Sequence, residues 1–434
     1  MAFVGLIVGA GFASGQEMLQ YFVAFGRWGV LGAVIAGVLM ALTGMICLQL
    51  GSYFQADEHL SVLEKVTFPW MSRILDIAVS ITLFSVGFVM FAGAGSNLEQ
   101  EFGLDVWVGA VLMVVMVLAA GMLDVGKVSN VMGAATPVII VFLAGACIYA
   151  MMHSGESLST LEPVANELPT SLPNWFISSM NYVGFCLMVA ISMAIVMGGD
   201  NVDPRSSAIG GLAGGTIYGI LLTLCTVALF SYIKVVKDED MPTLAIVQEI
   251  NPSLGTAMAL VIYIMIFNTA IGMFYALAKR LAKGDQSKFQ KWLFILVGVG
   301  FVLSFIGFRQ LVAYVYPALG YIGVALIVVL IVAWWRGRSM IKGETERRIR
   351  IRELMAMRFD PNRPYSREEA AEMRREIASS NIEDEELLES ITEEVRDELE
   401  DTSELDESTT ASAEPEAESD PETESESEDS TSVK

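Results

Sequence analysis

The sequence is poor in the residues that build metal centres, disulfide frameworks and catalytic triads. Its 434 residues include only four cysteines and two histidines. The cysteines are scattered through apolar runs without the spacing of metal ligands, so we expect them to be small packing residues. The histidines stand far apart, and neither supports a metal site or a triad. These six residues are Cys47, Cys147, Cys186, Cys225, His59 and His153.

Two signals of other protein classes are missing as well. No Gly-x-x-x-x-Gly-Lys-[Ser/Thr] motif occurs in the chain, so a P-loop that binds nucleoside triphosphates is excluded. The first apolar run has no basic residues in front of it and continues into further apolar sequence, which argues against a cleavable signal peptide. We expect neither enzymatic activity nor a nucleic-acid partner.

Apolar residues, by contrast, are abundant. They make up 53% of the chain, and the mean hydropathy is +0.53, values typical of a polytopic membrane protein. Ten apolar segments are long enough to span a bilayer, so we expect an all-α fold with lipid as its surroundings. Their ranges are about 1–26, 28–54, 71–97, 105–123, 129–152, 174–199, 206–233, 252–281, 289–307 and 310–335.

Basic residues in the loops predict the orientation. With the N-terminus in the cytoplasm, ten Lys and Arg fall in or beside the predicted inner loops and four in the outer ones. Lys and Arg concentrate on the cytoplasmic side of membrane proteins. We therefore expect a multi-pass protein of the plasma membrane with both termini cytoplasmic. The stretch from His153 to Pro173 contains no Lys or Arg and is predicted to be external.

The chain changes character where the last apolar segment ends. Residues 1–336 form the predicted membrane domain. Residues 337–400 are rich in charge and are predicted to be cytoplasmic and helical, with Ser366 and Glu369 placed for a capping box at one helix start. Residues 401–434 hold thirteen Asp or Glu and one Lys, with almost no large apolar residues. Such a segment cannot bury a core and is predicted to be a disordered tail.

The most informative motif interrupts the first apolar segment. Three glycines fall within Gly9–Gly15, and glycine is the least favourable ordinary residue in a helix interior. Backbone that leaves the helix at membrane depth is tolerated only where protein buries it or a cavity faces it. Small residues at this spacing also suit close helix packing. The polar Ser14, Gln16 and Glu17 beside the glycines favour a substrate-binding site.

A weaker interruption is predicted five segments later. The sixth segment carries Asn181-Tyr182-Val183-Gly184-Phe185 at its middle. Five helices separate equivalent positions, so the halves, about 1–152 and 174–336, would have opposite topology. Interrupted helices at matching places of inverted repeats typically form a site at the bilayer midplane. The stretch 242–250 is long enough for an external helix that acts as a lid.

The nine residues from Gly9 to Glu17, Gly-Ala-Gly-Phe-Ala-Ser-Gly-Gln-Glu, resemble the signature of the YkvI-like amino-acid permeases. This family belongs to the amino acid–polyamine–organocation (APC) superfamily and has the fold of the leucine transporter LeuT. The resemblance covers about residues 1–336. It implies a five-plus-five inverted repeat of ten helices, with helices 1 and 6 broken. It also implies a symporter that couples a small substrate to Na⁺ or H⁺ by alternating access.

The resemblance assigns the substrate site to the two interruptions. Ala10 and Gly11 would offer backbone amides to a substrate carboxylate. Tyr182, Gly184 and Phe185 would form a lid and an apolar wall, although aromatic residues in membrane helices also serve simply to pack. The candidate substrate-binding residues are Gly9, Ala10, Gly11, Phe12, Ala13, Ser14, Gly15, Tyr182, Gly184 and Phe185.

The resemblance also implies a Na⁺ site, if sodium is the coupling ion. Gly5 and Val8 would offer carbonyl oxygens, and Asn268 and Thr269 of the eighth segment would complete the coordination. Interhelical hydrogen bonding is an equally ordinary role for Asn and Thr in membranes. Apart from this ion, no cofactor is expected.

Glu17 is the residue that is hardest to place in lipid. A charged carboxylate at membrane depth is disfavoured by a few kcal/mol on insertion scales and commonly marks a transport pathway. Two roles fit the sequence equally. Glu17 is either a coupling group that takes up a proton or a structural acid that reaches water at the outer interface.

These features predict a secondary transporter for an amino acid or a related zwitterion. The alternative is a membrane sensor that keeps the fold, does not transport and signals through its cytoplasmic tail. The start of the chain carries a further expectation. The eight residues before Gly9 give about 12 Å of helix, against about 15 Å for half of the hydrocarbon core. We therefore expect the natural protein to begin upstream of Met1.

Overall fold

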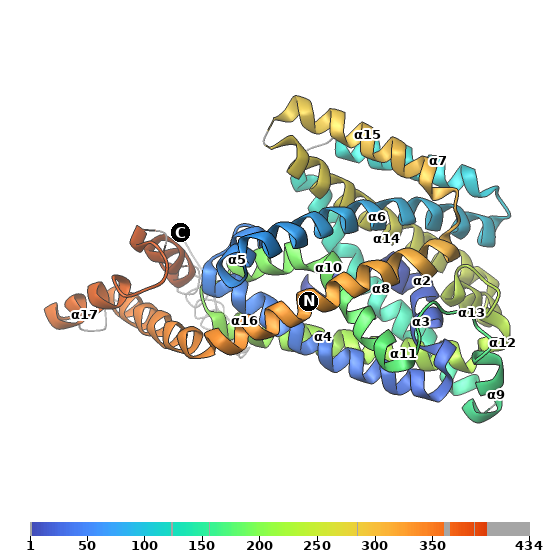
Figure 1. Ribbon diagram of the computed structural model, residues 1–434, viewed down its shortest axis with the longest axis horizontal. Helices are drawn as coiled ribbons and strands as arrows, with labels where there is room; N and C mark the ends of the chain where they lie inside the picture. The colour runs from blue at the N-terminus through green and yellow to red at the C-terminus, as the bar shows by residue number, and fades with distance from the viewer. Residues whose placement is uncertain are drawn as a thin grey trace, which may run out of the picture. The chain divides into compact units, whose positions relative to one another are not determined.

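A computed structural model describes residues 2–122, 125–155, 157–283, 285–359, 365–385 and 387–396. The labelled elements in these residues are all helices, as the sequence predicts (Figure 1). Met1 and the predicted acidic tail, 401–434, lie outside the described residues. The chain divides into two compact units, Met1–Ile349 and Arg350–Lys434.

The first unit consists of long apolar helices connected by short ones. A 3₁₀ turn, Val23–Phe25, precedes the first long helix. The helices are α1 (Ala2–Ile7), α2 (Ala10–Ser14), α3 (Gln16–Tyr21), α4 (Gly26–Phe54), α5 (His59–Val66), α6 (Pro69–Phe102), α7 (Val106–Gly121), α8 (Val125–His153), α9 (Leu158–Ala165), α10 (Trp175–Gly199), α11 (Pro204–Ser231), α12 (Ile233–Val236), α13 (Pro242–Ile250), α14 (Pro252–Ala282), α15 (Gln286–Ser304) and α16 (Phe308–Phe359).

Several of these helices are long and apolar enough to cross a membrane, so the chain is a multi-pass membrane protein. Seven helical stretches of the described residues meet this condition, and α7 and the part of α8 from Ile140 to His153 are shorter apolar helices. Each of the ten predicted segments coincides with helix in the structure. The number of segments that actually cross the bilayer stays a prediction.

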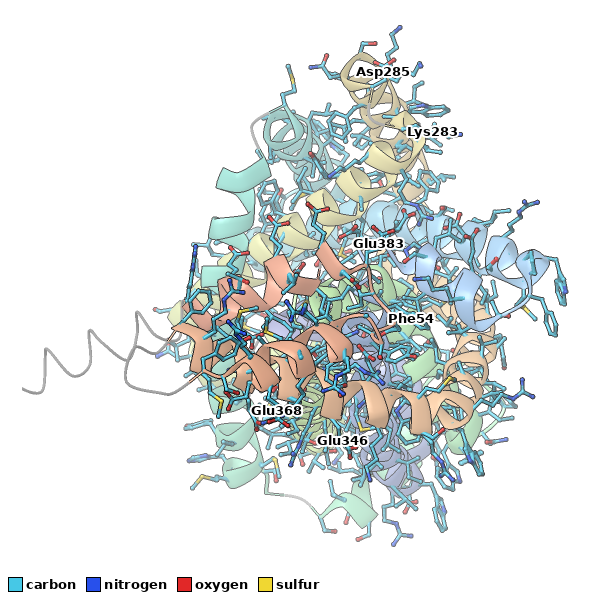
Figure 2. The ribbon with its side chains drawn as sticks, turned by 90° about the vertical axis from the view of Figure 1, so that its left-hand side faces the viewer. Phe54, Lys283, Asp285, Glu346, Glu368 and Glu383 are labelled. Carbon is cyan, nitrogen blue, oxygen red and sulfur yellow. The ribbon has the colours of Figure 1, made fainter. Side chains whose placement is uncertain are left out.

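Proline and side-chain caps mark where many of these helices begin. Proline is the first residue of α6, α11, α13 and α14, where its missing N–H would have had no helical acceptor. Asp285 caps α15 by accepting from the amides of Ser287 and Lys288 at 3.0 and 3.3 Å. Hydrogen bonds from the Lys288 side chain and from Ser287 lower the pKa of Asp285. Figure 2 shows Asp285 and Lys283 at the turn between α14 and α15.

The helices of the first unit fall into two groups. One places α4 along α11 and α10, and the other places α6 against α14, α7 and α15 (Figure 1). Glycines line the seam between α4 and α11: a β-carbon built on Gly219 would lie 2.6 Å from the Cα of Gly37. Small residues let two backbones approach closely, which is how helices associate where lipid is as apolar as their side chains.

The sixth apolar segment is one unbroken helix, so the predicted interruption at 181–185 is wrong. α10 continues without a break from Trp175 to Gly199. Gly184 serves close packing instead, because a β-carbon there would lie 2.5 Å from the carbonyl oxygen of Gly320 in α16. A single glycine weakens a helix by about 1 kcal/mol. That is less than the cost of leaving backbone groups without partners in hydrocarbon.

The last helix that begins in the first unit, α16, ends in the second unit and is far longer than a membrane requires. α16 has 52 residues, which corresponds to about 78 Å, against about 30 Å for the hydrocarbon core. The predicted end of the membrane domain, near Arg336, lies within this helix, and the first unit extends to Ile349. Beyond Arg336 the helix has further buried residues, among them Glu344 and Arg348.

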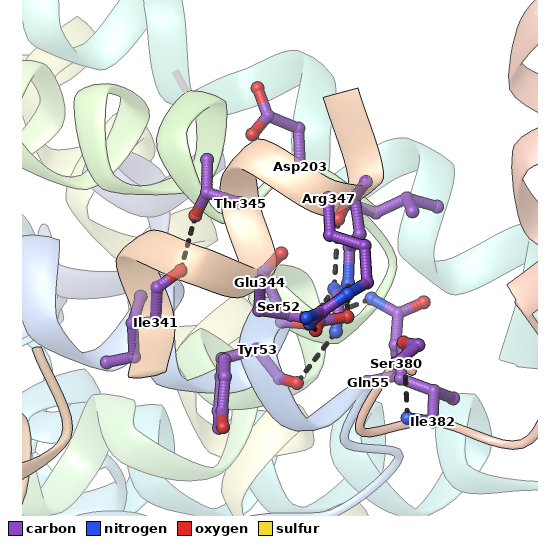
Figure 3. Close-up of polar contacts among 12 residues, drawn as sticks. Ser52, Tyr53, Gln55, Asp203, Ile341, Glu344, Thr345, Arg347, Ser380 and Ile382 are labelled. Carbon is purple, nitrogen blue, oxygen red and sulfur yellow. Dashed lines mark hydrogen bonds and ion pairs between the residues drawn. The ribbon is translucent and has the colours of Figure 1, made fainter. Parts of the chain in front are cut away.

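Arg348 fastens this extension to the ends of α4 and α10. Its side chain is 2% exposed, and its Nε donates to Oε1 of Glu344 at 3.0 Å. The guanidinium also donates to the carbonyl oxygens of Ser52 and Tyr53 at 2.9 Å and of Val202 at 3.0 Å. Figure 3 shows Glu344, Ser52 and Tyr53 grouped in this cluster. The planar fork of arginine suits three carbonyls better than the point charge of lysine would.

The second unit contains α17 (Arg367–Ile377), which begins with the predicted capping box. Oγ of Ser366 accepts from the amide of Glu369 at 3.2 Å, and the Glu369 carboxylate accepts from the amide of Ser366 at 2.5 Å. These hydrogen bonds lower the pKa of Glu369. Within the same unit, Nε of Arg350 pairs with Glu372 at 2.8 Å.

We expect Arg348→Ala to destabilise the first unit by about 2–4 kcal/mol, because each buried polar group that loses its partner costs about 1–3 kcal/mol. The substitution removes a donor from the carbonyls of Tyr53 and Val202, while the buried Glu344 carboxylate keeps Arg347 as an ion-pair partner. Unfolding of the purified protein in detergent would measure the loss. The control is Arg336→Ala, because Arg336 is exposed on the same helix. Equal stability of the two variants would contradict a fastening role for Arg348.

Candidate substrate-binding site

The first apolar segment is divided into three short helices, α1, α2 and α3, as its glycines predict. The regular hydrogen-bond pattern of α1 stops at Val8, whose amide donates to the carbonyl of Val4 at 2.9 Å. Gly9 is extended, with φ −94° and ψ −179°. The pattern resumes where the amide of Ala13 donates to the carbonyl of Gly9 at 3.0 Å. The last carbonyls of α1 and the first amides of α2 thus fall outside the regular helical pattern.

A second bend occurs at Gly15, which has a φ of +83°. This left-handed conformation favours glycine, and a β-carbon there would also approach Cγ2 of Thr243 to 2.8 Å. Thr243 belongs to α13 and donates through Oγ1 to the carbonyl of Ala13. Oγ of Ser14 donates to the carbonyl of Gly11 at 2.8 Å. The stretch predicted to form a short helix is therefore α13, and it partners one carbonyl of the interrupted segment.

Glu17 lies at the end of a buried chain of hydroxyl groups. Its side chain is only 6% exposed, and Oε2 accepts from the hydroxyl of Tyr182 at 3.0 Å. That hydroxyl lies 2.6 Å from the hydroxyl of Tyr218, and both tyrosines are fully buried. The Glu17 carboxyl folds back over Gly11, because a β-carbon built on Gly11 would lie 2.8 Å from Cδ of Glu17. One carboxyl group therefore connects the interrupted segment to α10 and α11.

Aromatic rings surround this chain of hydroxyls. Tyr21 and Phe22 meet the ring of Tyr182 edge-on, with centroids 5.1 and 5.0 Å away. Phe12 packs against Tyr218 at 5.1 Å. The tyrosine whose hydroxyl binds the Glu17 carboxyl is therefore itself packed among aromatic rings.

A second polar chain joins α3 to α10 and α16. The hydroxyl of Tyr21 donates to Oδ1 of Asn181 at 3.3 Å, and Nδ2 of Asn181 donates to the carbonyl of Pro317 at 2.9 Å. Pro317 has no N–H, so the carbonyl of Ala313 loses its helical donor. Oγ of Ser171 donates to that carbonyl at 2.6 Å instead. The polar residues of the sixth segment thus bridge helices, which explains why they do not accompany a break.

The predicted ion ligands lie where α14 passes the interrupted segment. A β-carbon built on Gly9 would lie 3.9 Å from Oγ1 of Thr269. Gly5, Gly9, Asn268 and Thr269 are all partly exposed, whereas Val8 is buried. Oδ1 of Asn268 has no hydrogen-bond partner among the described residues. Neutral oxygens of this kind suit a hard cation.

The structure places the other predicted site residues as follows. Phe12, Ala13 and Ser14 are buried in α2, and the backbone of Ala10 begins that helix while its side chain lies outside the described part. Phe185 stacks on Tyr316 of α16 with centroids 4.1 Å apart.

Sequence reasoning missed Tyr218. It lies in α11 among glycines whose spacing indicates only packing. The available signal was a phenol hydroxyl in the middle of an apolar segment, because a buried tyrosine normally finds a hydrogen-bond partner.

His59 is not alone in space, although it is alone in sequence. Its Nδ1 lies 3.1 Å from Oγ of Ser192, and its Nε2 lies 3.3 Å from Oδ1 of Asp76. Asp76 also pairs with Arg280. The cluster links α5, α6, α10 and α14.

One of the four cysteines lies beside the chain of hydroxyl groups. All four cysteines are free and buried. The sulfur of Cys186 lies 3.7 Å from the hydroxyl of Tyr218, which belongs to the chain of hydroxyls that ends at Glu17. Within the described residues, no three His, Cys, Asp or Glu side chains are arranged to hold a metal ion.

Comparison with known proteins gives relatives and a fold. No protein-family model matches the chain. The uncharacterized membrane protein YkvI of Bacillus subtilis (strain 168) is 25% identical over 332 residues, which cover 76% of this chain and 93% of the relative. The uncharacterized protein YyaD of the same organism is 24% identical over 330 residues, covering 76% and 94%.

Two solved structures show the same architecture. The inward-facing conformation of Mhp1 matches with a TM-score of 0.51 at 14% identity, covering 77% of this chain and 74% of Mhp1. MhsT in complex with L-phenylalanine matches with a TM-score of 0.50 at 12% identity, covering 90% and 96%. The chain therefore has the LeuT-like fold. At these identities, the likeness extends to the fold alone.

We expect Gly11→Leu to abolish ligand binding while the protein remains inserted and folded. The leucine side chain would occupy the space that the Glu17 carboxyl now fills and would displace it from Tyr182. Thermal-shift measurements with amino acids and amines would test binding. Gly210→Leu is the matched control, because Gly210 is exposed and a β-carbon there meets nothing within 4 Å. Undiminished binding by Gly11→Leu would show that this glycine only packs.

Proposed function

We propose that this protein is a secondary transporter that moves a small molecule with an amino group across the plasma membrane by alternating access. The expected class is an amino acid or a related compound, and the expected coupling ion is H⁺ or Na⁺. The proposal includes ten membrane-spanning helices in two inverted halves, with both termini in the cytoplasm. α10 is intact in this arrangement, so only the first half contributes an interrupted helix.

One observation carries the proposal: a buried carboxyl group lies at a backbone interruption in the middle of a membrane segment. Polar and charged groups are expensive in lipid and usually mark a transport pathway. Mhp1 and MhsT share this fold, and the MhsT structure was solved in complex with L-phenylalanine. A small organic ligand at the interruption fits both findings.

Contacts around the interruption also suit alternating access. α13 covers one side of α2 through the hydrogen bond from Thr243 to Ala13. Gly5 and Gly9 in the preceding part of the segment are partly exposed. In the proposed orientation, α13 lies on the external side of the interruption and Gly5 lies on its cytoplasmic side.

Uptake by proteoliposomes that contain the purified full chain is the direct test. Labelled amino acids and amines would be offered with an imposed proton gradient, with a sodium gradient and with neither. Concentrative uptake that collapses with one gradient would establish transport and identify the coupling ion. Ligand binding without any uptake would favour the sensor that the cytoplasmic segment suggests.

Glu17→Gln should flatten the pH dependence of uptake if the proton is the coupling ion. The amide keeps the shape of the side chain and its place beside Tyr182, but it cannot gain or lose a proton in this range. Initial rates between pH 5 and pH 8 would show the change. The control is Glu64→Gln, because Glu64 is exposed on α5. An unchanged profile in Glu17→Gln would make Glu17 a structural acid.

Thr269→Ala should weaken activation by Na⁺ if sodium is the coupling ion. The substitution removes the hydroxyl oxygen nearest to Gly9, and each lost ligand weakens a hard-cation site. The measurement is the Na⁺ concentration that gives half-maximal uptake. Thr256→Ala, near the start of the same helix, is the control, since its hydroxyl donates to Glu101 at 2.6 Å. Identical Na⁺ activation in Thr269→Ala and the wild type would remove the proposed ion site.

Truncation separates transport from any role of the cytoplasmic segment. A chain that ends after Ile349 retains the first unit and the Arg348 contacts, so its uptake should match that of the full chain. A chain that ends after Arg338 loses Glu344 and Arg348 and should be less stable. Uptake and detergent melting of both chains would be compared. Loss of uptake by the folded 349-residue chain would point to regulation by the second unit.

A further inference from the structure

The carboxyl group of Glu17 lies over Gly11, a residue that the proposed function assigns to substrate binding. The resemblance to amino-acid permeases assigns the backbone around Gly11 to a substrate carboxylate. In the structure, a β-carbon built on Gly11 would lie 2.8 Å from Cδ of Glu17, so the chain's own carboxyl covers this position. Two carboxylates at one position would repel each other and would both be poorly solvated.

We propose that Glu17 is the recognition group for a cationic amine, and that the transported molecule is an organic amine without a carboxylate. The inference rests on the proposed function and narrows its substrate class. The ligand supplies an ammonium and an apolar body. The chain supplies the negative charge that an amino acid would otherwise carry.

The charge balance around Glu17 favours a cation. Glu17 is 6% exposed, and its carboxyl group receives one hydrogen bond, from the hydroxyl of Tyr182. No ion pair to Glu17 occurs in the described part of the chain. A buried carboxylate needs a cation and further donors to offset its lost hydration. A primary ammonium brings one positive charge and three N–H donors.

Other buried oxygens without a hydrogen-bond partner also favour a ligand that brings N–H donors. Oε1 of Gln16, Oε1 of Gln20 and Oδ1 of Asn268 are buried and have no hydrogen-bond partner among the described residues. Gln16 and Gln20 belong to α3, and Asn268 belongs to α14, which contacts α2. The amide nitrogen of Gln20 already donates to the carbonyl of Arg309 at 3.1 Å. A surplus of acceptors is satisfied by a ligand rich in donors, whereas a carboxylate would add to the surplus.

The aromatic surroundings suit the apolar body of such a ligand. Tyr21, Phe22 and Tyr182 form one contact group, and Phe12 packs on Tyr218. The face of an aromatic ring carries negative potential and attracts ammonium groups. Carboxylate, hydroxyls and rings together therefore favour an organic cation over an anion.

Three matched sets of compounds test the proposal by thermal shift on the full chain in detergent. Each set contains an amino acid, the corresponding amine and the corresponding acid: alanine, ethylamine and propanoate; leucine, 3-methylbutylamine and 4-methylpentanoate; phenylalanine, phenethylamine and 3-phenylpropanoate. A ligand that binds the folded state raises its melting temperature. We expect at least one amine to stabilise the protein more than its amino acid does, and no acid to stabilise it.

Variants at position 17 assign the effect to the carboxylate. Glu17→Gln should weaken binding of the stabilising amine by at least about thirty-fold, as expected when one partner of a buried charge pair is lost. Glu17→Asp keeps the negative charge and should retain the preference for amine over acid, which covers the case in which the amide variant does not fold. Glu64→Gln should bind the amine like the wild type.

Two results would overturn the inference. One is stabilisation by an amino acid or an acid with none by any amine, and the other is amine binding that survives in Glu17→Gln. Failure of the proposed function looks different. Amine binding without uptake would leave the recognition role of Glu17 intact and remove transport. Uptake of amino acids without amine binding would leave transport intact and remove the inference.

Discussion

The need to partner every backbone polar group in the absence of water governs this structure. In hydrocarbon, a carbonyl or amide outside the helical pattern must find another donor or acceptor within the protein. Two carbonyls in the described residues that lie beside a glycine interruption or a proline receive a hydrogen bond from a side chain instead of from a helical amide. Thr243 partners Ala13 beside the interruption, and Ser171 partners Ala313 four residues before Pro317. These hydrogen bonds join two connecting segments to the helices whose carbonyls they partner.

The interruption in the first segment is therefore a junction rather than a local irregularity. Folding the chain back at Gly15 brings Glu17 over Gly11 and into contact with Tyr182 of α10. Tyr182 in turn contacts Tyr218 of α11, and Tyr21 reaches α16 through Asn181. A change in the protonation or ligand binding of the Glu17 carboxyl group would alter contacts with both α10 and α11. Such a contiguous polar network is the kind of element through which a bound ligand could bias the packing of helices.

Different helices are held together by different contacts: some by close backbone packing and others by polar networks. The seam between α4 and α11 relies on glycines and has no need of charge, because the backbones themselves make contact. The extension of α16 beyond Arg336 relies on Arg348, whose fork binds three carbonyls at once. Contact between glycine backbones suits the lipid interior. A buried arginine that binds carbonyls is energetically acceptable only where the helix has left the lipid.

The sequence alone determined the helical class, the position of each apolar segment and the interruption at Gly9–Gly15. These features depend on composition and on neighbours along the chain, as does the capping box at Ser366. The tertiary structure decided the rest. From sequence alone, a glycine that ends a helix cannot be told from a glycine that packs against another helix. The continuous α10 and the close approach of Gly184 to Gly320 identify Gly184 as a packing residue. The direction of the Glu17 side chain was equally invisible, because it depends on Tyr182 and Gly11 meeting in space.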